Sequence, residues 1–171
     1  PVVDIWGGVA DPASARPWQR DTISLVFSAA KGPTATCINR LVEAGQLDVD
    51  RPVADYWPEF GCNGKEQITT RMVLSHQAGL AAVDGELTLA EVFAWDPVVE
   101  AIAAQAPNWE PGSMHGYHAR SFGWILGELL RRITGLSLGT YLAAEIATPL
   151  DLRFWIGLPA AQLPHCATLV P

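Results

Sequence analysis

TISLVFSAAKGPTATCINRLVEAG (residues 22–45) changes character at Ser28. Residues 22–27 are apolar and rich in β-branched and aromatic types, which is typical of a short strand. From Ser28 onward, apolar residues recur at helical spacing, and Gly45 stands where helices commonly end. Pro33 removes one backbone hydrogen bond, so we expect a kink or a tightened first turn. The stretch therefore predicts a strand that leads directly into a helix, with Ser28 at the junction.

Ser28 and Lys31 are three residues apart, so on a helix they share one face. A serine hydroxyl is a weak nucleophile until a base removes its proton, and a desolvated lysine can lose its charge and act as that base. The helix start also offers backbone N–H groups to developing negative charge. An S-x-x-K triplet arises often by chance, and a capping serine beside a solvated lysine is the alternative. The small neighbours Ala29, Ala30 and Gly32 favour a site that a substrate can reach.

A second candidate, Tyr117, stands far along the chain. It follows a turn-rich stretch, residues 107–116, and precedes the clearest amphipathic pattern, a helix expected over Ser121–Thr134. Ser121 is the expected N-cap, and Gly135 lies just past the expected end. A tyrosine on such a loop can carry a proton to or from a reacting group. A half-buried ring with its hydroxyl in water is the alternative.

The histidines form no recognisable triad with an acidic residue. We interpret His76 as a structural hydrogen-bonding residue. His118 adjoins Tyr117 and is a candidate for lining a pocket, but not for catalysis. Three tryptophans are expected to fill the core: Trp109, Trp124 and Trp155.

Elsewhere the sequence favours helices over strands. The opening residues, Pro1–Gly8, are apolar and β-branched and predict a strand that ends at a Gly-Gly turn. Leu47–Phe60 is typical of a loop with a helical turn. Further helices are expected over Ile68–Ser75 with Thr69 or Thr70 as N-cap, over Leu89–Gln105, and from Leu138 to about Ile146. These segments predict an α+β fold in which a mostly helical region lies beside an incomplete sheet.

Composition limits the classes of protein to which the chain can belong. Its 171 residues are 49% hydrophobic and 17% charged, with a formal net charge of -7, which suits one globular domain. An acidic chain without a basic cluster argues against nucleic acid as a partner. No apolar run reaches the roughly 20 residues of a membrane-spanning helix. Three cysteines without metal-ligand spacing are interpreted as buried thiols and favour a reducing, cytoplasmic compartment: Cys37, Cys62 and Cys166.

Four ordered segments resemble the serine β-lactamase-like hydrolases, and most of all the family VIII carboxylesterases, relatives of class C β-lactamases and D-alanyl-D-alanine carboxypeptidases. They are FSAAKGPTA (27–35), similar to the nucleophile segment; residues 41–60, similar to the stretch after it; ITTRMVLSHQAGL (68–80), similar to the H-x-x-G-L segment; and residues 109–135, similar to the region of the catalytic tyrosine. The resemblance implies a β-lactamase/transpeptidase-like α+β fold with an antiparallel sheet. It also implies an acyl-enzyme on Ser28, with Lys31 and Tyr117 exchanging its proton and no metal or organic cofactor.

Two departures qualify the resemblance. The family's Tyr-x-Asn motif would place an asparagine that helps to hold a substrate amide at the position of Ala119, and this change favours esters over β-lactams or peptides. The family's third motif, Lys-Thr-Gly or Trp-Gly-Gly on a strand that supplies an oxyanion N–H, has no counterpart after Leu150. We therefore expect residues 1–171 to form a partial domain, truncated at both ends. The lack of a targeting signal in this stretch is then no sign that the whole protein has none. A further chain segment or a partner would complete its sheet.

The sequence thus predicts a serine esterase that acts on small, short-acyl carboxylic esters. It leaves open whether Lys31 or Tyr117 is the base. Loss of one oxyanion donor costs about 2.7–4 kcal/mol of transition-state stabilisation, so we expect the 171-residue chain alone to be weakly active or inactive. Two alternatives stay open: a β-lactamase or D,D-carboxypeptidase, and a catalytically silent binding relative.

Overall fold

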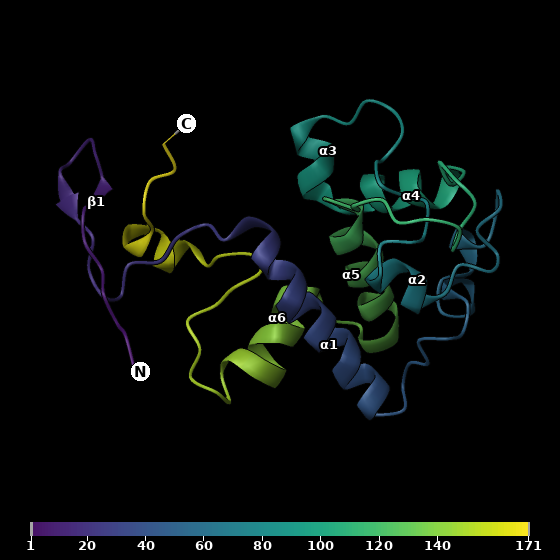
Figure 1. The fold of residues 1–171 in the computed structure, drawn as a ribbon, viewed down its shortest axis with the longest axis horizontal. Coiled ribbons are helices and arrows are strands. Elements are labelled where there is room, and N and C mark those ends of the chain that lie inside the picture. Colours follow the sequence, from purple (N-terminus) through teal and green to yellow (C-terminus); the bar gives the residue numbers. More distant parts are fainter. Residues whose placement is uncertain (1, 171) are drawn as a thin grey trace.

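The computed structural model describes residues 2–170, and most of their regular structure is helical. Figure 1 shows the helices gathered into one body, while the two ends of the chain lie together at its side. Among the described residues the strands are Val9–Asp11 (β1) and Arg16–Pro17 (β2), which pair antiparallel in that terminal region. The predicted combination of a helical region with a small antiparallel sheet is confirmed.

Neither predicted strand forms where the sequence placed it. Residues 2–8 of the predicted Pro1–Gly8 strand form no strand, and Pro1 lies outside the described residues. Within Thr22–Phe27, Ile23 alone is bridged, in parallel, to the C-terminal segment. A strand is stable where its backbone N–H and C=O groups are paired along its length. Because the described part of the chain pairs with this run at Ile23 only, through an isolated bridge to Cys166, the apolar run stays irregular.

Helix α1 (Lys31–Glu43) follows directly on a single 3-10 turn, Phe27–Ala30 (η1), so the first turn is tightened as the sequence predicted. Pro33 lies in the first turn of α1, where a missing backbone N–H costs least. At the other end, Gly45 has a φ of 69°, and its N–H and that of the next residue bond back to carbonyls of the last turn. The predicted glycine terminus is confirmed.

The helix predicted over Leu89–Gln105 is wrong as a single element. The structure has two helices, α3 (Leu89–Ala94) and α4 (Asp96–Ala104), separated by Trp95 with a φ of 71°. The cause is Pro97, which has no N–H to bond the carbonyl four residues earlier and whose ring would clash with that carbonyl. The break turns the Trp95 side chain toward α5.

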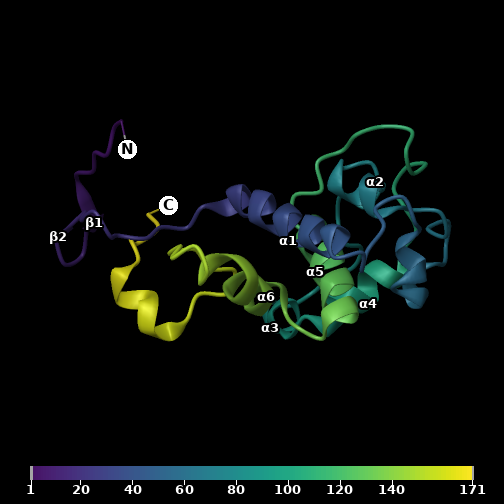
Figure 2. The same cartoon turned by 90° about the horizontal axis from the view of Figure 1, so that it is seen from below.

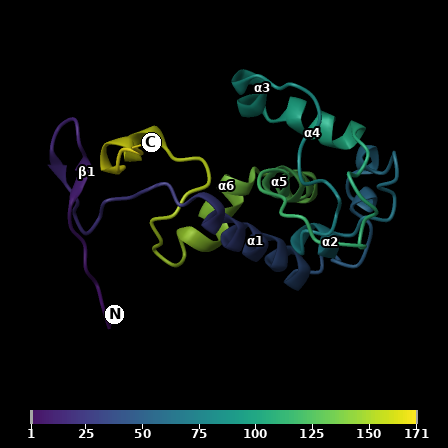
Figure 3. The same cartoon turned by 45° about the horizontal axis from the view of Figure 1, so that its top comes forward.

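Helix α5 (Ser121–Thr134) is the centre of the helical body and has the predicted bounds. It packs against α1, α2 (Thr70–Leu74), α4 and α6 (Leu138–Leu142), and Figure 3 shows it nearly end-on among them. A π-helical turn, Ala143–Ala147, continues α6. Four apolar side chains on successive turns of α5 are fully buried in the core: Ile125, Leu126, Leu129 and Leu130. A buried apolar face at this spacing is what the sequence pattern predicted.

The helix ends agree with the sequence in part. Thr69 caps α2 by accepting a hydrogen bond from the Met72 N–H, as predicted. Arg120 occupies the N-cap position of α5, so the prediction of Ser121 as N-cap is wrong. The Ser121 hydroxyl donates instead to the Leu80 carbonyl, because it is buried against that loop.

Smaller elements complete the chain. The 47–60 segment, predicted as a loop with one helical turn, contains two 3-10 turns, Val53–Asp55 (η2) and Pro58–Phe60 (η3). Another, Ala160–His165 (η5), lies near the C-terminus. The three tryptophans that were expected to fill the core are only half-buried: Trp109, Trp124 and Trp155. Cys37 is buried as predicted, whereas Cys62 and Cys166 are half-buried, and all three thiols are free. Within residues 2–170, no helix is long and apolar enough to span a membrane.

A buried carboxylate ties α5 to the Trp95 break. Glu128 is 1% exposed and accepts hydrogen bonds from the Trp95 indole N–H (3.0 Å), from Arg131 (2.7 Å) and from Arg132 (2.7 Å). Burial alone would raise the pKa of Glu128, but these hydrogen bonds outweigh it and hold the pKa below its ordinary value. Gly127 makes the contact possible, because a Cβ there would come within 2.6 Å of the Trp95 ring.

Replacing Glu128 by glutamine should therefore destabilise the fold strongly. The change leaves two guanidinium groups beside a buried neutral amide, and breaking a buried ion pair costs about 3–5 kcal/mol. Urea denaturation measures the loss. The control is Glu59→Gln, which removes the exposed partner of Arg132 (2.7 Å) and should cost less than about 1 kcal/mol. Equal losses in the two variants would contradict the central role of Glu128.

Candidate active site

Ser28 and Lys31 are brought together by the 3-10 turn η1. Side chains three residues apart are eclipsed on a 3-10 helix, and the Lys31 Nζ lies 3.3 Å from the Ser28 Oγ. Phe27, the residue before Ser28, has a φ of 45°, in the left-handed region that a phenylalanine seldom adopts. Such a conformation costs on the order of 1–3 kcal/mol and is found where function requires a special backbone path. The strained residue leaves Ser28 exposed at the start of α1.

Tyr117 approaches the same serine from the loop before α5. Its hydroxyl lies 2.6 Å from the Ser28 Oγ, although the two residues are 89 positions apart. Lys31 links the two segments a second time, because its Nζ donates to the Ala119 carbonyl at 2.8 Å and lies 4.7 Å from the centre of the Tyr117 ring. The structure therefore brings all three predicted site residues into one hydrogen-bonded group.

The environment of Tyr117 favours its ionised form. Its hydrogen bond with Ser28, and then its hydrogen bond with Lys31, lower the pKa of Tyr117 below its usual value, and the Lys31 charge acts in the same direction. The side chain is 55% exposed, so solvent reaches the phenol. A tyrosine with a lowered pKa loses its own proton more readily, and the resulting tyrosinate can accept the proton of the serine hydroxyl that it contacts.

His76 supports the tyrosine loop, as the sequence predicted for a structural hydrogen-bonding residue. Its carbonyl accepts from the Gly116 N–H (3.0 Å), and its Nδ1 accepts from the His118 N–H (3.2 Å). Burial, then the charges of Lys31 and His115, lower the pKa of His76. The ring is thereby kept neutral and able to accept.

The suggestion that His118 lines a pocket is wrong. Its side chain is fully buried, and its two ring nitrogens contact the backbone of Gly116 and Leu80. Sequence reasoning missed this role, and its one available signal was the position of His118 directly after Tyr117. Gly116 is also constrained, since a Cβ there would come within 2.2 Å of the Trp109 ring.

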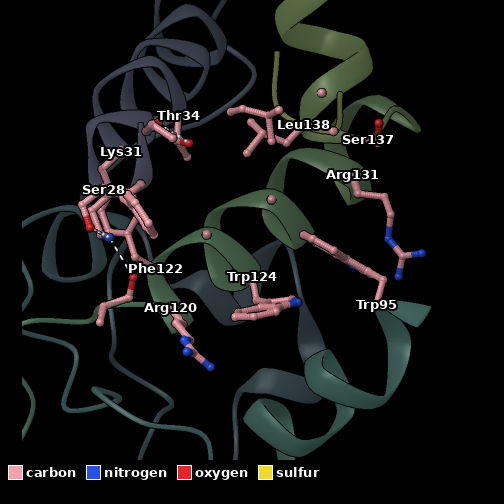
Figure 4. A pocket seen from close by; sticks show the side chains of 18 residues that line it. Ser28, Lys31, Thr34, Trp95, Arg120, Phe122, Trp124, Arg131, Ser137 and Leu138 are labelled. Carbon is pink, nitrogen blue, oxygen red and sulfur yellow. Dashed lines mark hydrogen bonds between the residues drawn. The ribbon is translucent and has the colours of Figure 1, made fainter. Parts of the chain in front are cut away.

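A cavity of about 840 Å³ opens beside Ser28 and extends along α5 toward the start of α6. In Figure 4, Ser28 and Lys31 lie at one end of it, and Trp95 and Arg131 lie at the other. Apolar side chains dominate the wall between these ends: Phe122, Trp124, Leu138 and Ile156. The cavity can therefore take an apolar group attached to a carbonyl that reaches Ser28.

The site residues include no candidate metal centre. Within residues 2–170, no group of three or more His, Cys, Asp and Glu side chains is arranged to hold a metal ion.

Comparison with known proteins gives consistent matches over most of the chain. The β-lactamase family model matches residues 1–170. The esterase/β-lactamase LipL of Mycobacterium tuberculosis is 43% identical over 165 residues, which cover 96% of this chain and 38% of that protein. A crystal structure of a family VIII carboxylesterase superposes with a TM-score of 0.92 at 42% identity, over 97% of this chain and 46% of that one. A penicillin-binding protein homologue from Caulobacter crescentus gives 0.91 at 42% identity, over 96% and 44% of the two chains.

The chain spans less than half the length of these relatives, between 38% and 46% of each. Its own residues place a serine, a lysine and a tyrosine together beside a cavity.

Proposed function

Because this chain belongs to the β-lactamase family, we propose that its Ser28 is the nucleophile of a serine hydrolase that cleaves short-acyl carboxylic esters. The observation that carries the proposal is the 2.6 Å contact between the Tyr117 hydroxyl and the Ser28 Oγ, with Lys31 within 3.3 Å of the same atom. The family VIII carboxylesterase among the similar structures supports the choice of esters, and the esterase/β-lactamase LipL is consistent with it.

The first half of the reaction forms an acyl-enzyme. The Ser28 Oγ attacks the ester carbonyl, and its proton passes to Tyr117, which lies nearer (2.6 Å) than the Lys31 Nζ (3.3 Å). The ester C–O bond then breaks, and the leaving alkoxide takes the proton and departs as an alcohol. Lys31 stays protonated in this scheme, and its charge stabilises the phenolate while it is held by the Ala119 carbonyl.

The second half of the reaction releases the acid. Water attacks the acyl-enzyme, Tyr117 takes one of its protons, and the Ser28 Oγ recovers a proton as the carboxylic acid leaves. The Ser28 N–H belongs to the first turn of the helical segment, where backbone N–H groups lack a partner within the helix. It is therefore available as a donor to the oxyanion that forms in each half.

Ala119 favours esters over β-lactams within this proposal. It lies two residues after Tyr117 and lines the cavity with a methyl group, which makes no hydrogen bond to a substrate amide. Esters have better leaving groups than amides and depend less on such a bond. β-Lactamase or D,D-carboxypeptidase activity is therefore the second candidate.

Labelling with a fluorophosphonate tests the nucleophile. Intact-mass spectrometry should show a single adduct on the unaltered protein and none on Ser28→Ala, because the reagent reacts with activated serines. The reaction is run on the 171-residue chain and on any longer protein that contains it. Labelling of the longer protein alone would mean that further residues complete the site. Absence of an adduct in both would overturn the hydrolase proposal and favour the silent binding relative.

A comparison of substrates tests the preference for esters. We expect a higher kcat/KM for a short-acyl nitrophenyl ester than for a chromogenic β-lactam. Ala119→Asn should raise β-lactam turnover about tenfold, the value of one hydrogen bond, and should leave ester turnover nearly unchanged. Faster turnover of the β-lactam than of the ester by the unaltered protein would contradict the assignment.

A further inference from the structure

His118 is a buried titratable residue that the proposed reaction does not use. Its side chain is 0% exposed, whereas its neighbour Tyr117 is 55% exposed. A polar group is retained in such a place when each of its hydrogen-bonding atoms has a partner. The role of His118 is therefore to be found in the contacts of its two ring nitrogens.

Those contacts fix both the position and the protonation of the ring. The Nδ1 lies 2.6 Å from the Gly116 carbonyl, which can only accept, so Nδ1 carries the proton. The Nε2 lies 3.0 Å from the Leu80 N–H, which can only donate, so Nε2 presents its lone pair. A single neutral tautomer satisfies both groups.

Both peptide groups that flank Tyr117 are held by imidazole-bearing residues. The Gly116 carbonyl receives the His118 Nδ1–H, and the Gly116 N–H donates to the His76 carbonyl at 3.0 Å. On the other side of Tyr117, the His118 N–H donates to the His76 Nδ1 at 3.2 Å. The backbone of the tyrosine is thus fixed on both sides, although its side chain projects into solvent.

We propose that His118 is a positioning residue for Tyr117: its neutral ring joins the tyrosine loop to Leu80 and so holds the phenol within 2.6 Å of the Ser28 Oγ. The catalytic consequence rests on the proposed function. The joint is reinforced on the other side of the same residue, since the Ser121 hydroxyl donates to the Leu80 carbonyl. Both polar groups of Leu80 are therefore bound by side chains of the 118–121 segment.

The joint depends on pH in a defined direction. Protonation of His118 would place a second N–H opposite the Leu80 N–H and break the contact. Burial lowers the pKa of His118 below 6.5. The hydrogen bond to the Gly116 carbonyl partly offsets this by raising the pKa, and the charge of the neighbouring His76 lowers it further. The titratable group next to the His118 ring is His76. Lys31, His115 and Tyr117 are in turn the titratable groups near His76. Because the folded pKa lies below 6.5, the joint is still intact at pH 6.5 and is lost as the pH falls through the folded pKa.

Two substitutions test the role. His118→Leu removes both ring hydrogen bonds and keeps a side chain of similar bulk, while His118→Asn keeps a donor on the Gly116 side. Ultraviolet titration of tyrosinate, corrected with Tyr117→Phe, follows Tyr117 without requiring activity. The pH at which half of Tyr117 is ionised, its midpoint, should rise toward about 10 in the leucine variant. In the asparagine variant the midpoint should lie between those of the unaltered protein and the leucine variant. On esters, kcat should fall roughly 100-fold in the leucine variant with little change in KM.

Ile125→Val is the control, because it removes one methyl group from the α5 core, where Ile125 is fully buried, and leaves the hydrogen-bonding groups of His118 and Tyr117 unchanged. It should leave the tyrosinate midpoint and kcat unchanged. If His118→Leu gives the same midpoint as Ile125→Val, the positioning role is overturned. If the leucine variant does not fold, the Tyr117 midpoint of the asparagine variant is compared with that of Ile125→Val instead, and equal midpoints again overturn the role. If the unaltered protein cleaves no ester, the proposed function fails, while the midpoint still decides the role of His118.

Discussion

The packing of α1 against α5 is the constraint on which the site depends. One helix carries Lys31 at its start and follows directly on Ser28, and the loop before the other carries Tyr117. Residues so far apart in sequence stay within hydrogen-bonding distance only if the two helices keep one relative position. A well-packed core provides that rigidity, and Figure 2 shows α1 lying along the body that α5, α6 and α4 form. The Lys31–Ala119 hydrogen bond fastens the same junction at the surface.

The residues around this junction form an exposed outer layer and a buried inner layer. The outer layer is wet and contains the hydroxyls of Ser28 and Tyr117, which water and substrate can reach. The inner layer is dry and contains the imidazole of His118, which meets only backbone partners. An exposed tyrosine on a loop would ordinarily sample many positions. Here the buried layer restricts the backbone, so the exposed layer can offer a defined phenol to the serine. The exposed group that contacts the serine is thus separate from the buried group that binds the backbone of its loop.

Local patterns in the sequence predicted the parts of this structure that local physics decides. The apolar spacing of residues 121–134 fixed the bounds of α5, and Gly45 ended α1 as expected. A serine–lysine spacing and a loop tyrosine made Ser28, Lys31 and Tyr117 candidates, and the family resemblance favoured them over the alternatives. The structure brings the three side chains together. The strand over 22–27 failed because strand pairing depends on a distant neighbour that composition does not reveal. The role of His118 was missed for a similar reason: its two partners are backbone groups, which leave no mark on the sequence.

The central claim is that Tyr117 acts with Ser28 to form an acyl-enzyme. Rapid-quench intact-mass spectrometry during turnover of a short-acyl ester tests it most directly, with Tyr117→Phe compared against the unaltered protein. The account predicts one acyl group per chain, located on Ser28, which forms and decays in the unaltered protein. In the phenylalanine variant it should form roughly 10²–10⁴-fold more slowly. Ester hydrolysis without an acylated serine, or acylation at an equal rate in both proteins, would contradict the account.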